Sequence, residues 1–153
     1  MIKKYFLKSP CYGRVVKSSE KEIGIFIPYK ANHNIFSIID GTIKSVTFET
    51  GKYIKNVFET KHIKGGKATI TITNKNLSIK YSAFVGFPYR VNSIKFYNKK
   101  GDYIKRAKII AKILYGSFCE IYLFKKYNIK NIVNFGDKII GGKTNIGFIS
   151  YQN

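Results

Sequence analysis

The chain has 153 residues, the size of one domain and enough to bury a hydrophobic core. With 44% apolar and 16% aromatic residues, its composition excludes an intrinsically disordered chain. Lys and Arg number 28 against 8 acidic residues, so the formal net charge is +20, and such a surface attracts nucleic acid, anionic lipid or an acidic protein surface.

Short motifs exclude several further classes. The N-terminus has too few apolar residues before Pro10 for a signal peptide, and no window approaches the ~20 apolar residues of a membrane helix. Cys11 and Cys119 lack the spacing of metal ligands, and only His33 and His62 could add imidazoles, so we expect no metal site. Two buried free thiols in an intracellular, non-secreted protein are the simplest interpretation.

Segments rich in β-branched and aromatic residues predict strands. In chain order they cover residues 22–29, 35–40, 42–49, 68–74, 77–87, 93–98, 119–124 and 131–135, with Gly, Asn and Asp turn signals between them. Strands of this length and spacing predict one mainly β domain over residues 1–153, antiparallel and barrel-like or sandwich-like, with at most short helices. One helix is left open over 105–113, where the pattern is compatible with an amphipathic helix.

A small pair, Gly116-Ser117, interrupts the apolar run from 112 to 124. A glycine at this point can bend a strand. Alternatively, the peptide bond between the two residues is one that the protein breaks in a self-processing reaction. The two interpretations separate a structural protein from an enzyme.

One pattern occurs twice, over 41–56 and 129–149: an apolar strand, a glycine turn, a short apolar pair and a second turn. The second copy resembles the hammerhead turn of biotinyl and lipoyl carrier domains. No lysine lies in the hairpin context that those carriers use, so we do not expect a swinging-arm carrier. The repeat favours a barrel-sandwich architecture in which two half-units pack together.

The order and spacing of several motifs resemble the phosphatidylserine decarboxylase family along nearly the whole chain. Residues 9–15 (SPCYGRV) are similar to the family's Ser-Pro-x-Asp-Gly-x-Val opening, and 24–43 are similar to its Phe-x-x-Pro-x-x-x-His segment. Residues 101–118 resemble the run Gly-Asp-x-Val-x-Arg-Gly-x-x-x-Gly-x-Ile-x-Phe-Gly-Ser, and 135–149 resemble the last hairpin. The chain would correspond to the catalytic core, without the N-terminal membrane-associating segment of many members.

This resemblance implies a chemistry for Gly116-Ser117. In the family the serine hydroxyl attacks the carbonyl of the preceding glycine, the peptide becomes an ester, and elimination leaves a pyruvoyl group on the new N-terminus. Cleavage here would give fragments 1–116 and 117–153. The pyruvoyl group would form a Schiff base with the amine of the serine headgroup and accept electrons as carbon dioxide leaves. This reaction would be a step of phospholipid synthesis.

The same resemblance reveals departures at positions that the reaction needs. Tyr12 stands where the family has its Asp, and Phe36 stands at the base His position, three residues after His33. A serine hydroxyl needs a base, usually oriented by a carboxylate, so these residues predict that the chain does not cleave itself. His33 occupies the position of a residue implicated in decarboxylation, as a proton donor, and would be vestigial without a pyruvoyl group. His62 is expected in a lysine-rich surface loop, a region that lacks the family's Asn-Glu-Arg stretch.

Three functional classes stay open. The departures and the charge favour the first, a decarboxylase-like pseudoenzyme without a cofactor that serves as a structural or binding protein for an anionic partner. The AT-rich coding bias behind the excess of Lys over Arg suits a large DNA virus or a reduced parasite, so a virion component is one form of this class.

The second class is an active pyruvoyl-dependent phosphatidylserine decarboxylase that cleaves at Gly116-Ser117. The third is a nucleic-acid-binding β domain, in which Lys contacts phosphates and aromatic rings stack on bases, as the interleaved segments 97–106 and 123–130 permit. A homo-oligomer is one option that the sequence leaves open. So is pairing of Cys11 with Cys119, which flank two motifs that the family brings together.

Overall fold

The computed structural model describes residues 2–28, 30–55, 62–75, 78–85, 94–114, 118–122 and 129–152. Within these ranges the regular structure is β-strand, without a helix. The strands are β1 (Ile2–Lys8), β2 (Gly13–Ser18), β3 (Glu22–Phe26), β4 (Asn34–Phe36), β5 (Gly41–Lys55), β6 (His62–Thr73), β7 (Ser78–Val85), β8 (Ile94–Phe96), β9 (Tyr103–Ile104), β10 (Ile109–Ile113), β11 (Phe118–Tyr122), β12 (Ile129–Asn131), β13 (Lys138–Ile139) and β14 (Asn145–Gln152). The predicted mainly β class is confirmed.

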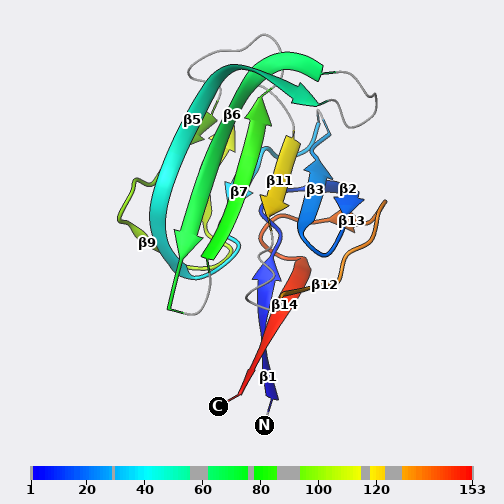
Figure 1. Cartoon of the computed structure of the whole chain (residues 1–153), viewed down its shortest axis with the longest axis vertical. Helices are drawn as coiled ribbons and strands as arrows, with labels where there is room; N and C mark the ends of the chain where they lie inside the picture. The colour runs from blue at the N-terminus through cyan, green and yellow to red at the C-terminus, as the bar shows by residue number, and fades with distance from the viewer. Residues whose placement is uncertain are drawn as a thin grey trace.

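Antiparallel pairing joins these strands into three sheets. The largest has the order β13-β2-β3-β11-β7-β6-β5-β9, and the two smaller ones have the orders β1-β14-β12 and β4-β10-β8. In Figure 1 the long strands β5, β6 and β7 curve together along one side of the molecule, while β1 and β14 extend from its lower end and bring the two chain ends close together. The first and last strands of the chain therefore pair with each other in one sheet.

The core is built mostly from isoleucine. The period-two pattern of β6 is an example. Ala68, Ile70 and Ile72 are at most 2% exposed, whereas Thr71 and Thr73 are half-buried. β-Branched side chains have few rotamers to lose in an extended backbone and pack well on a pleated surface. Side chains that are fully buried come from many parts of the chain, among them Leu7, Ile23, Ile25, Ile27, Ile35, Ile38, Ile39, Ile72, Ile79 and Ile121.

The helix left open over 105–113 is wrong. These residues form a turn at Arg106-Ala107 and then strand β10. Ala107 has a φ of 69°, in the left-handed region, which no regular helix or strand contains. Beyond this turn the isoleucines of β10 favour strand because their branched side chains crowd a helical turn.

Three other segments differ from their predicted form. The strand expected over 35–40 is the short β4, because after Phe36 the backbone bonds alternately to other segments: Ser37 N donates to Lys108 O (2.8 Å) and Ile38 O accepts from Lys8 N (3.1 Å). The strand expected over 131–135 ends at Asn131. His62 begins β6, opposite Lys55, instead of lying in a loop.

Asp40 holds the connection between β4 and β5. Its carboxylate accepts hydrogen bonds from the Tyr5 hydroxyl (2.9 Å) and the Arg106 backbone N–H (2.7 Å), and its own N–H donates to the Tyr5 oxygen (2.9 Å). The Arg106 guanidinium lies 4.9 Å from the centre of the Tyr5 ring and donates to Phe6 O (2.7 Å). Burial is the main cause that raises the pKa of Tyr5, so the phenol stays protonated and donates to the carboxylate. These bonds join β1, the start of β5 and the turn before β10.

The left-handed turn predicts opposite effects for two identical substitutions. We expect Ala107→Gly to raise the free energy of unfolding by about 0.5–1 kcal/mol, because the strain on a Cβ at positive φ exceeds the entropy that glycine adds to the unfolded chain. Ala111→Gly is the matched control: Ala111 is fully buried within β10, so the change removes packing and should lower the free energy of unfolding by about 1 kcal/mol or more. Urea denaturation measures both, and a destabilised Ala107→Gly would contradict the expectation.

Candidate functional site

Two aromatic rings meet at the centre of the candidate site. Tyr12, just before β2, and Phe36, the last residue of β4, pack edge to face with ring centroids 5.8 Å apart and planes at 64°. Phe36 is 9% exposed and Tyr12 is half-buried. The Phe36 N–H donates to Pro10 O (2.7 Å), which holds the segment before Tyr12 against β4. The positions that the family resemblance assigned to an Asp and a base His therefore contact each other, as an aromatic pair.

Two glycines also lie against the Phe36 ring. A Cβ on Gly141 would lie 2.6 Å from a Phe36 ring carbon and 3.0 Å from the backbone carbon of Cys11. A Cβ on Gly142, whose φ is +72°, would lie 2.8 Å from the same ring. The Gly142 N–H donates to Ser9 O (2.9 Å), which fixes this turn to the segment that carries Tyr12. The ring thus fills a close-fitting space between β4 and the turn after β13.

His33 lies at the edge of the same region. Its Nδ1 is 2.7 Å from Ala31 O, and because a carbonyl only accepts, Nδ1 carries the proton and Nε2 is left for another partner. The ring is half-buried. The Ile113 N–H donates to His33 O (3.0 Å), so His33 is attached to the end of β10. In sequence, this end leads directly toward the predicted processing pair.

Gly116 and Ser117 lie outside the described residues. The described chain reaches Leu114 and resumes at Phe118, the first residue of β11, which pairs with Phe26 of β3. Both flanks of the pair are therefore placed, one beside His33 and the other at the end of β3. The roles predicted for Gly116, Ser117 and His33 stay predictions.

The sequence left open whether Cys11 and Cys119 meet. In the structure the two thiols interact with each other. Both are fully buried and both are free thiols. Burial is the main cause that raises the pKa of the Cys11 thiol, and a side-chain hydrogen bond and electrostatic interaction with Cys119 add to it. Within the described ranges, no three His, Cys, Asp or Glu side chains gather in a group able to hold a metal ion.

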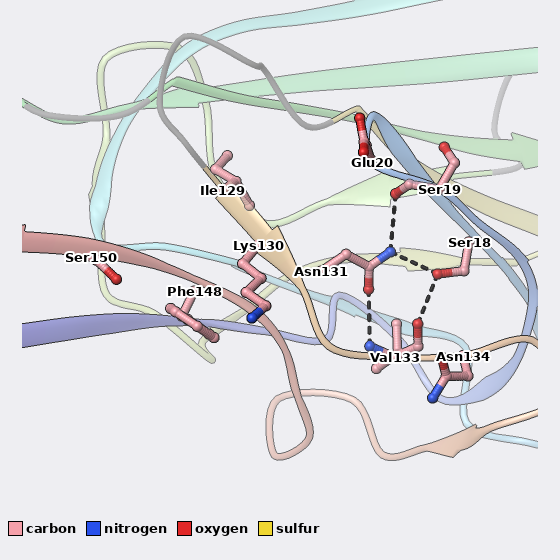
Figure 2. A pocket seen from close by; sticks show the side chains of 10 residues that line it. All are labelled: Ser18, Ser19, Glu20, Ile129, Lys130, Asn131, Val133, Asn134, Phe148 and Ser150. Carbon is pink, nitrogen blue, oxygen red and sulfur yellow. Dashed lines mark hydrogen bonds between the residues drawn. The ribbon is translucent and has the colours of Figure 1, made fainter.

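A second concavity lies at the opposite end of β2 from Tyr12. It has a volume of about 610 Å³, and Figure 2 shows it between the β2–β3 turn, β12 and β14. Asn131 organises its wall: Nδ2 donates to Ser18 Oγ (2.7 Å) and Ser19 O (3.1 Å), and Oδ1 accepts from Val133 N (2.9 Å). Its lining residues are Ser18, Ser19, Glu20, Ile129, Lys130, Asn131, Val133, Asn134, Phe148 and Ser150. The sequence analysis gave none of them a role as a pocket residue, although Ile129 and Lys130 end the interleaved segment 123–130. Because its central polar groups bond to one another, we interpret it as a structural junction.

The sequence also did not single out a cross-strand pair of lysines near the site. Lys95 of β8 lies directly opposite Lys112 of β10, and both side chains are exposed. Like charges directly opposite each other on a sheet are unfavourable. The signal was present only as an exposed lysine in each of two strands, and their register was needed to bring them together.

Among the described residues, no helix is long and apolar enough to cross a membrane.

Comparison with known proteins identifies relatives for nearly the whole chain. The family model for phosphatidylserine decarboxylase matches residues 5–147. A phosphatidylserine decarboxylase proenzyme of Carboxydothermus hydrogenoformans is 28% identical over 145 residues, which cover 95% of this chain and 62% of the relative. A phosphatidylserine decarboxylase proenzyme of Amoebophilus asiaticus is 27% identical over 157 residues, which cover 94% of this chain and 68% of the relative. The chain thus spans less than two thirds of the first relative and slightly more than two thirds of the second.

The close fit around Phe36 predicts different costs for two glycine substitutions. Gly142→Ala should lower the free energy of unfolding by about 2–3 kcal/mol, because the new Cβ adds a clash with the buried ring to the strain of a positive φ. Gly136→Ala is the matched control, since its φ is +90° and no atom lies within 4 Å of the added Cβ. It should cost only about 1 kcal/mol. Equal losses in urea denaturation would show that the ring does not occupy this space.

Proposed function

This chain belongs to the phosphatidylserine decarboxylase family, and we propose that it is a non-catalytic member whose basic surface binds an anionic partner. The observation that carries the first half is the contact between Tyr12 and Phe36. The family resemblance puts a carboxylate and a base at these positions, and here they hold a phenol and a hydrocarbon ring.

The surroundings of Phe36 support the loss of self-processing. Removing the proton from a serine hydroxyl requires a group that accepts it, and a positioned carboxylate or imidazole is the usual solution. Phe36 has no acceptor, and its ring is enclosed by Tyr12, Gly141 and Gly142. The described residues that would serve to form a pyruvoyl group therefore do not fit that role.

One observation favours a second candidate, an active pyruvoyl-dependent decarboxylase that uses a different base. The hydrogen bond from Ile113 N to His33 O places an imidazole beside the strand that leads to Gly116-Ser117. With Nδ1 bound to Ala31 O, Nε2 is the nitrogen that is left to exchange a proton. We rank this candidate second because the hydrogen-bond partner of the His33 ring within the described residues is a backbone carbonyl, not a carboxylate, and because Tyr12 replaces the family's Asp.

The mass of the purified chain decides between the two candidates. We expect one species at 17.6 kDa in a denaturing intact-mass spectrum, because the site lacks the groups that activate Ser117. Ser117→Ala is the matched control, since it cannot form a pyruvoyl group and should give an equally intact chain.

Two fragments, 1–116 and 117–153, in the wild-type spectrum but not in that of Ser117→Ala would overturn the non-catalytic proposal. A modified N-terminus on the smaller fragment would then identify the pyruvoyl group directly.

The second half of the proposal concerns the face made by Lys95, Tyr97, Lys112 and Leu114, here called the β8–β10 face. Lys95 and Lys112 are cross-strand neighbours, and the Lys95 ammonium lies 5.7 Å from the centre of the Tyr97 ring. Tyr97 is 50% exposed and Leu114 46% exposed. Paired lysines that repel each other gain from a bound anion, because it cancels the repulsion between them.

The mixture of charge and apolar surface on the β8–β10 face favours an anionic lipid surface over other polyanions. Lysine attracts anionic headgroups, while tyrosine and leucine suit the boundary between headgroups and acyl chains. The whole chain has 28 basic side chains and 8 acidic ones, so most of the positive charge stays available to such a partner. Of the two interleaved segments singled out in the sequence, 97–106 is described and 123–128 lies outside the described residues.

The setting that we propose is intracellular, alone or in an assembly formed there, a virion included. Its support is that Cys11 and Cys119 are free thiols, which fits a reducing compartment.

Binding to vesicles tests the β8–β10 face. We expect the wild-type chain to bind vesicles that contain phosphatidylserine or phosphatidylglycerol, with an affinity that falls as salt rises. Lys95→Gln together with Lys112→Gln should weaken this binding roughly tenfold or more, since each lysine at a membrane surface contributes about 1 kcal/mol. The control pair, Lys21→Gln with Lys138→Gln, removes the same charge from exposed sites elsewhere and should lose less.

Equal losses in the two double variants would show that net charge, not the β8–β10 face, attracts the vesicles. Salt-sensitive retention on duplex DNA with no vesicle binding would instead support the nucleic-acid-binding class.

A further inference from the structure

The lysines of the β8–β10 face belong to a row of side chains that crosses three strands. Lys112 of β10 lies directly opposite Lys95 of β8 on one side and directly opposite Asn34 of β4 on the other. Residues directly opposite each other in an antiparallel sheet project from the same face, with Cβ atoms about 4.5–5.5 Å apart. Two lysine side chains and one carboxamide therefore leave this surface side by side.

The polar groups of this row are available to a ligand. Both lysines are exposed, Asn34 is half-buried, and no acidic side chain of the described residues forms an ion pair with either lysine. The Asn34 backbone N–H donates to Asn32 Oδ1 (2.7 Å). Within the described part of the chain, the Asn34 carboxamide itself has no hydrogen-bond partner, so it is free to donate to a ligand at the row.

A second pair of facing cations shows how such a pair can be satisfied within the protein. Arg14 of β2 lies directly opposite Lys138 of β13, and the Arg14 guanidinium donates to Gly136 O (3.3 Å). The Lys95 ammonium instead lies 5.7 Å from the centre of the Tyr97 ring. A cation–π contact at an exposed site is weak, and it leaves the ammonium hydrogens for acceptors outside the protein.

The row suits an anion that carries more than one negative charge on one small group. Two facing lysines repel each other, and the attraction of both to a shared group grows with the charge of that group. A phosphomonoester carries about −1.5 to −2 at pH 7 and offers three acceptor oxygens. A phosphodiester carries a single negative charge. The phosphomonoester therefore matches two ammonium groups and a carboxamide donor better.

The side chains beside the row favour a phosphomonoester that belongs to a lipid. Tyr97 is 50% exposed and Leu114 is 46% exposed. A small soluble phosphate would leave both side chains in water. A lipid brings the boundary between headgroups and acyl chains to them, where an amphipathic tyrosine and a leucine are well accommodated.

We propose that the β8–β10 face is selective for phosphomonoester lipids, with the phosphate held jointly by Lys95, Lys112 and Asn34. This inference rests on the proposed binding of anionic lipid by the same face and adds the headgroup that the face prefers. The two ammonium groups and the Asn34 amide donate to the phosphate oxygens, and charge-assisted hydrogen bonds of this kind are stronger than neutral ones. Phosphodiester lipids bind the same face more weakly, through general attraction to its charge.

The experiment compares two kinds of vesicle with the full-length protein. Phosphatidylcholine vesicles contain either phosphatidic acid, a phosphomonoester lipid, or phosphatidylglycerol, a phosphodiester lipid, in amounts adjusted to the same zeta potential. Equal surface potential removes the general attraction of a basic protein from the comparison. We expect the wild-type chain to bind phosphatidic acid vesicles roughly fivefold or more tightly than phosphatidylglycerol vesicles.

The variants are judged by the ratio of these two affinities. Lys95→Gln together with Lys112→Gln should bring the ratio to about one, because glutamine keeps a donor but loses the charge. Asn34→Ala should lower the ratio roughly twofold, since it removes one donor and leaves the backbone bond to Asn32 in place. Lys21→Gln with Lys138→Gln is the matched control, which should weaken binding to both vesicles and leave the ratio unchanged.

A soluble competitor separates a lipid from a free phosphate. Glycerol 3-phosphate carries the same phosphomonoester without acyl chains, and we expect it not to displace the chain at concentrations equal to that of the lipid. Displacement at such concentrations would show that the ligand is a soluble phosphomonoester, and the lipid assignment would be wrong. A wild-type ratio near one, or a ratio that the control pair changes as much as the Lys95 and Lys112 pair does, would overturn the selectivity itself.

Failure of this inference is distinguishable from failure of the proposed function. Equal binding to both kinds of vesicle would remove the headgroup preference and leave the proposed binding of anionic lipid standing. Absence of binding to either kind would remove both. Cleavage at Gly116-Ser117 would overturn the non-catalytic proposal, and the affinity ratio would still be measured on the same preparation.

Discussion

The hydrogen bonds of Asp40 are the constraint on which the candidate site depends. Asp40 lies between Phe36 of β4 and the start of β5, and its carboxylate binds both the Tyr5 hydroxyl and the backbone of Arg106. Arg106 begins the turn before β10. One half-buried carboxylate therefore fixes the turn that leads into β10 to the connection between β4 and β5. The Tyr5 side chain in this arrangement is partly buried, and burial is the main cause that raises its pKa. Loss of either partner would leave a carboxylate with an unmet hydrogen bond in a half-buried position, which is costly.

The turns and strand pairing around the site are well defined, while the side chains that they hold differ from those that the family resemblance expects. Gly141, Gly142 and the pairing of β4 with β10 place Phe36 closely. The group that they place is a hydrocarbon ring, packed on Tyr12. Ala107 shows the same combination: the turn is in its left-handed form, although the residue has a Cβ that this form disfavours. These turns therefore form without the residues that the family resemblance expects at positions 36 and 107.

The sequence predicted strands such as β3 and β6 and missed others, among them β1 and β2. The alternation of Ala68, Ile70 and Ile72 with threonine predicted β6 through its period of two, although Thr69 on the second face is also buried, at 6% exposure. Strand β1 was missed because its first residues are exposed on both faces, with Leu7 the one fully buried side chain. At the site, the resemblance assigned positions 12 and 36 to residues of one reaction, and the structure brings Tyr12 and Phe36 into contact. The facing lysines 95 and 112 could not be predicted, because cross-strand register depends on the fold of the whole β4-β10-β8 sheet.

The packing between the segment before β2 and β4 also explains why a charged site here would require more than exchanging two side chains. A buried carboxylate or imidazole needs hydrogen-bond partners, and the backbone groups nearest to Phe36 already have them: Pro10 O binds Phe36 N, and Gly142 N binds Ser9 O. Beside them, Cys11 is buried near Cys119, and burial is the main cause that raises the pKa of the Cys11 thiol. The higher pKa favours the neutral form of this thiol. An aromatic pair and the buried Cys11 thiol, whose pKa is raised, can share this interior without any charge to satisfy. A carboxylate placed here would need a new partner for its charge, so the aromatic site is stabilised by the neutral surroundings that it shares with the cysteines.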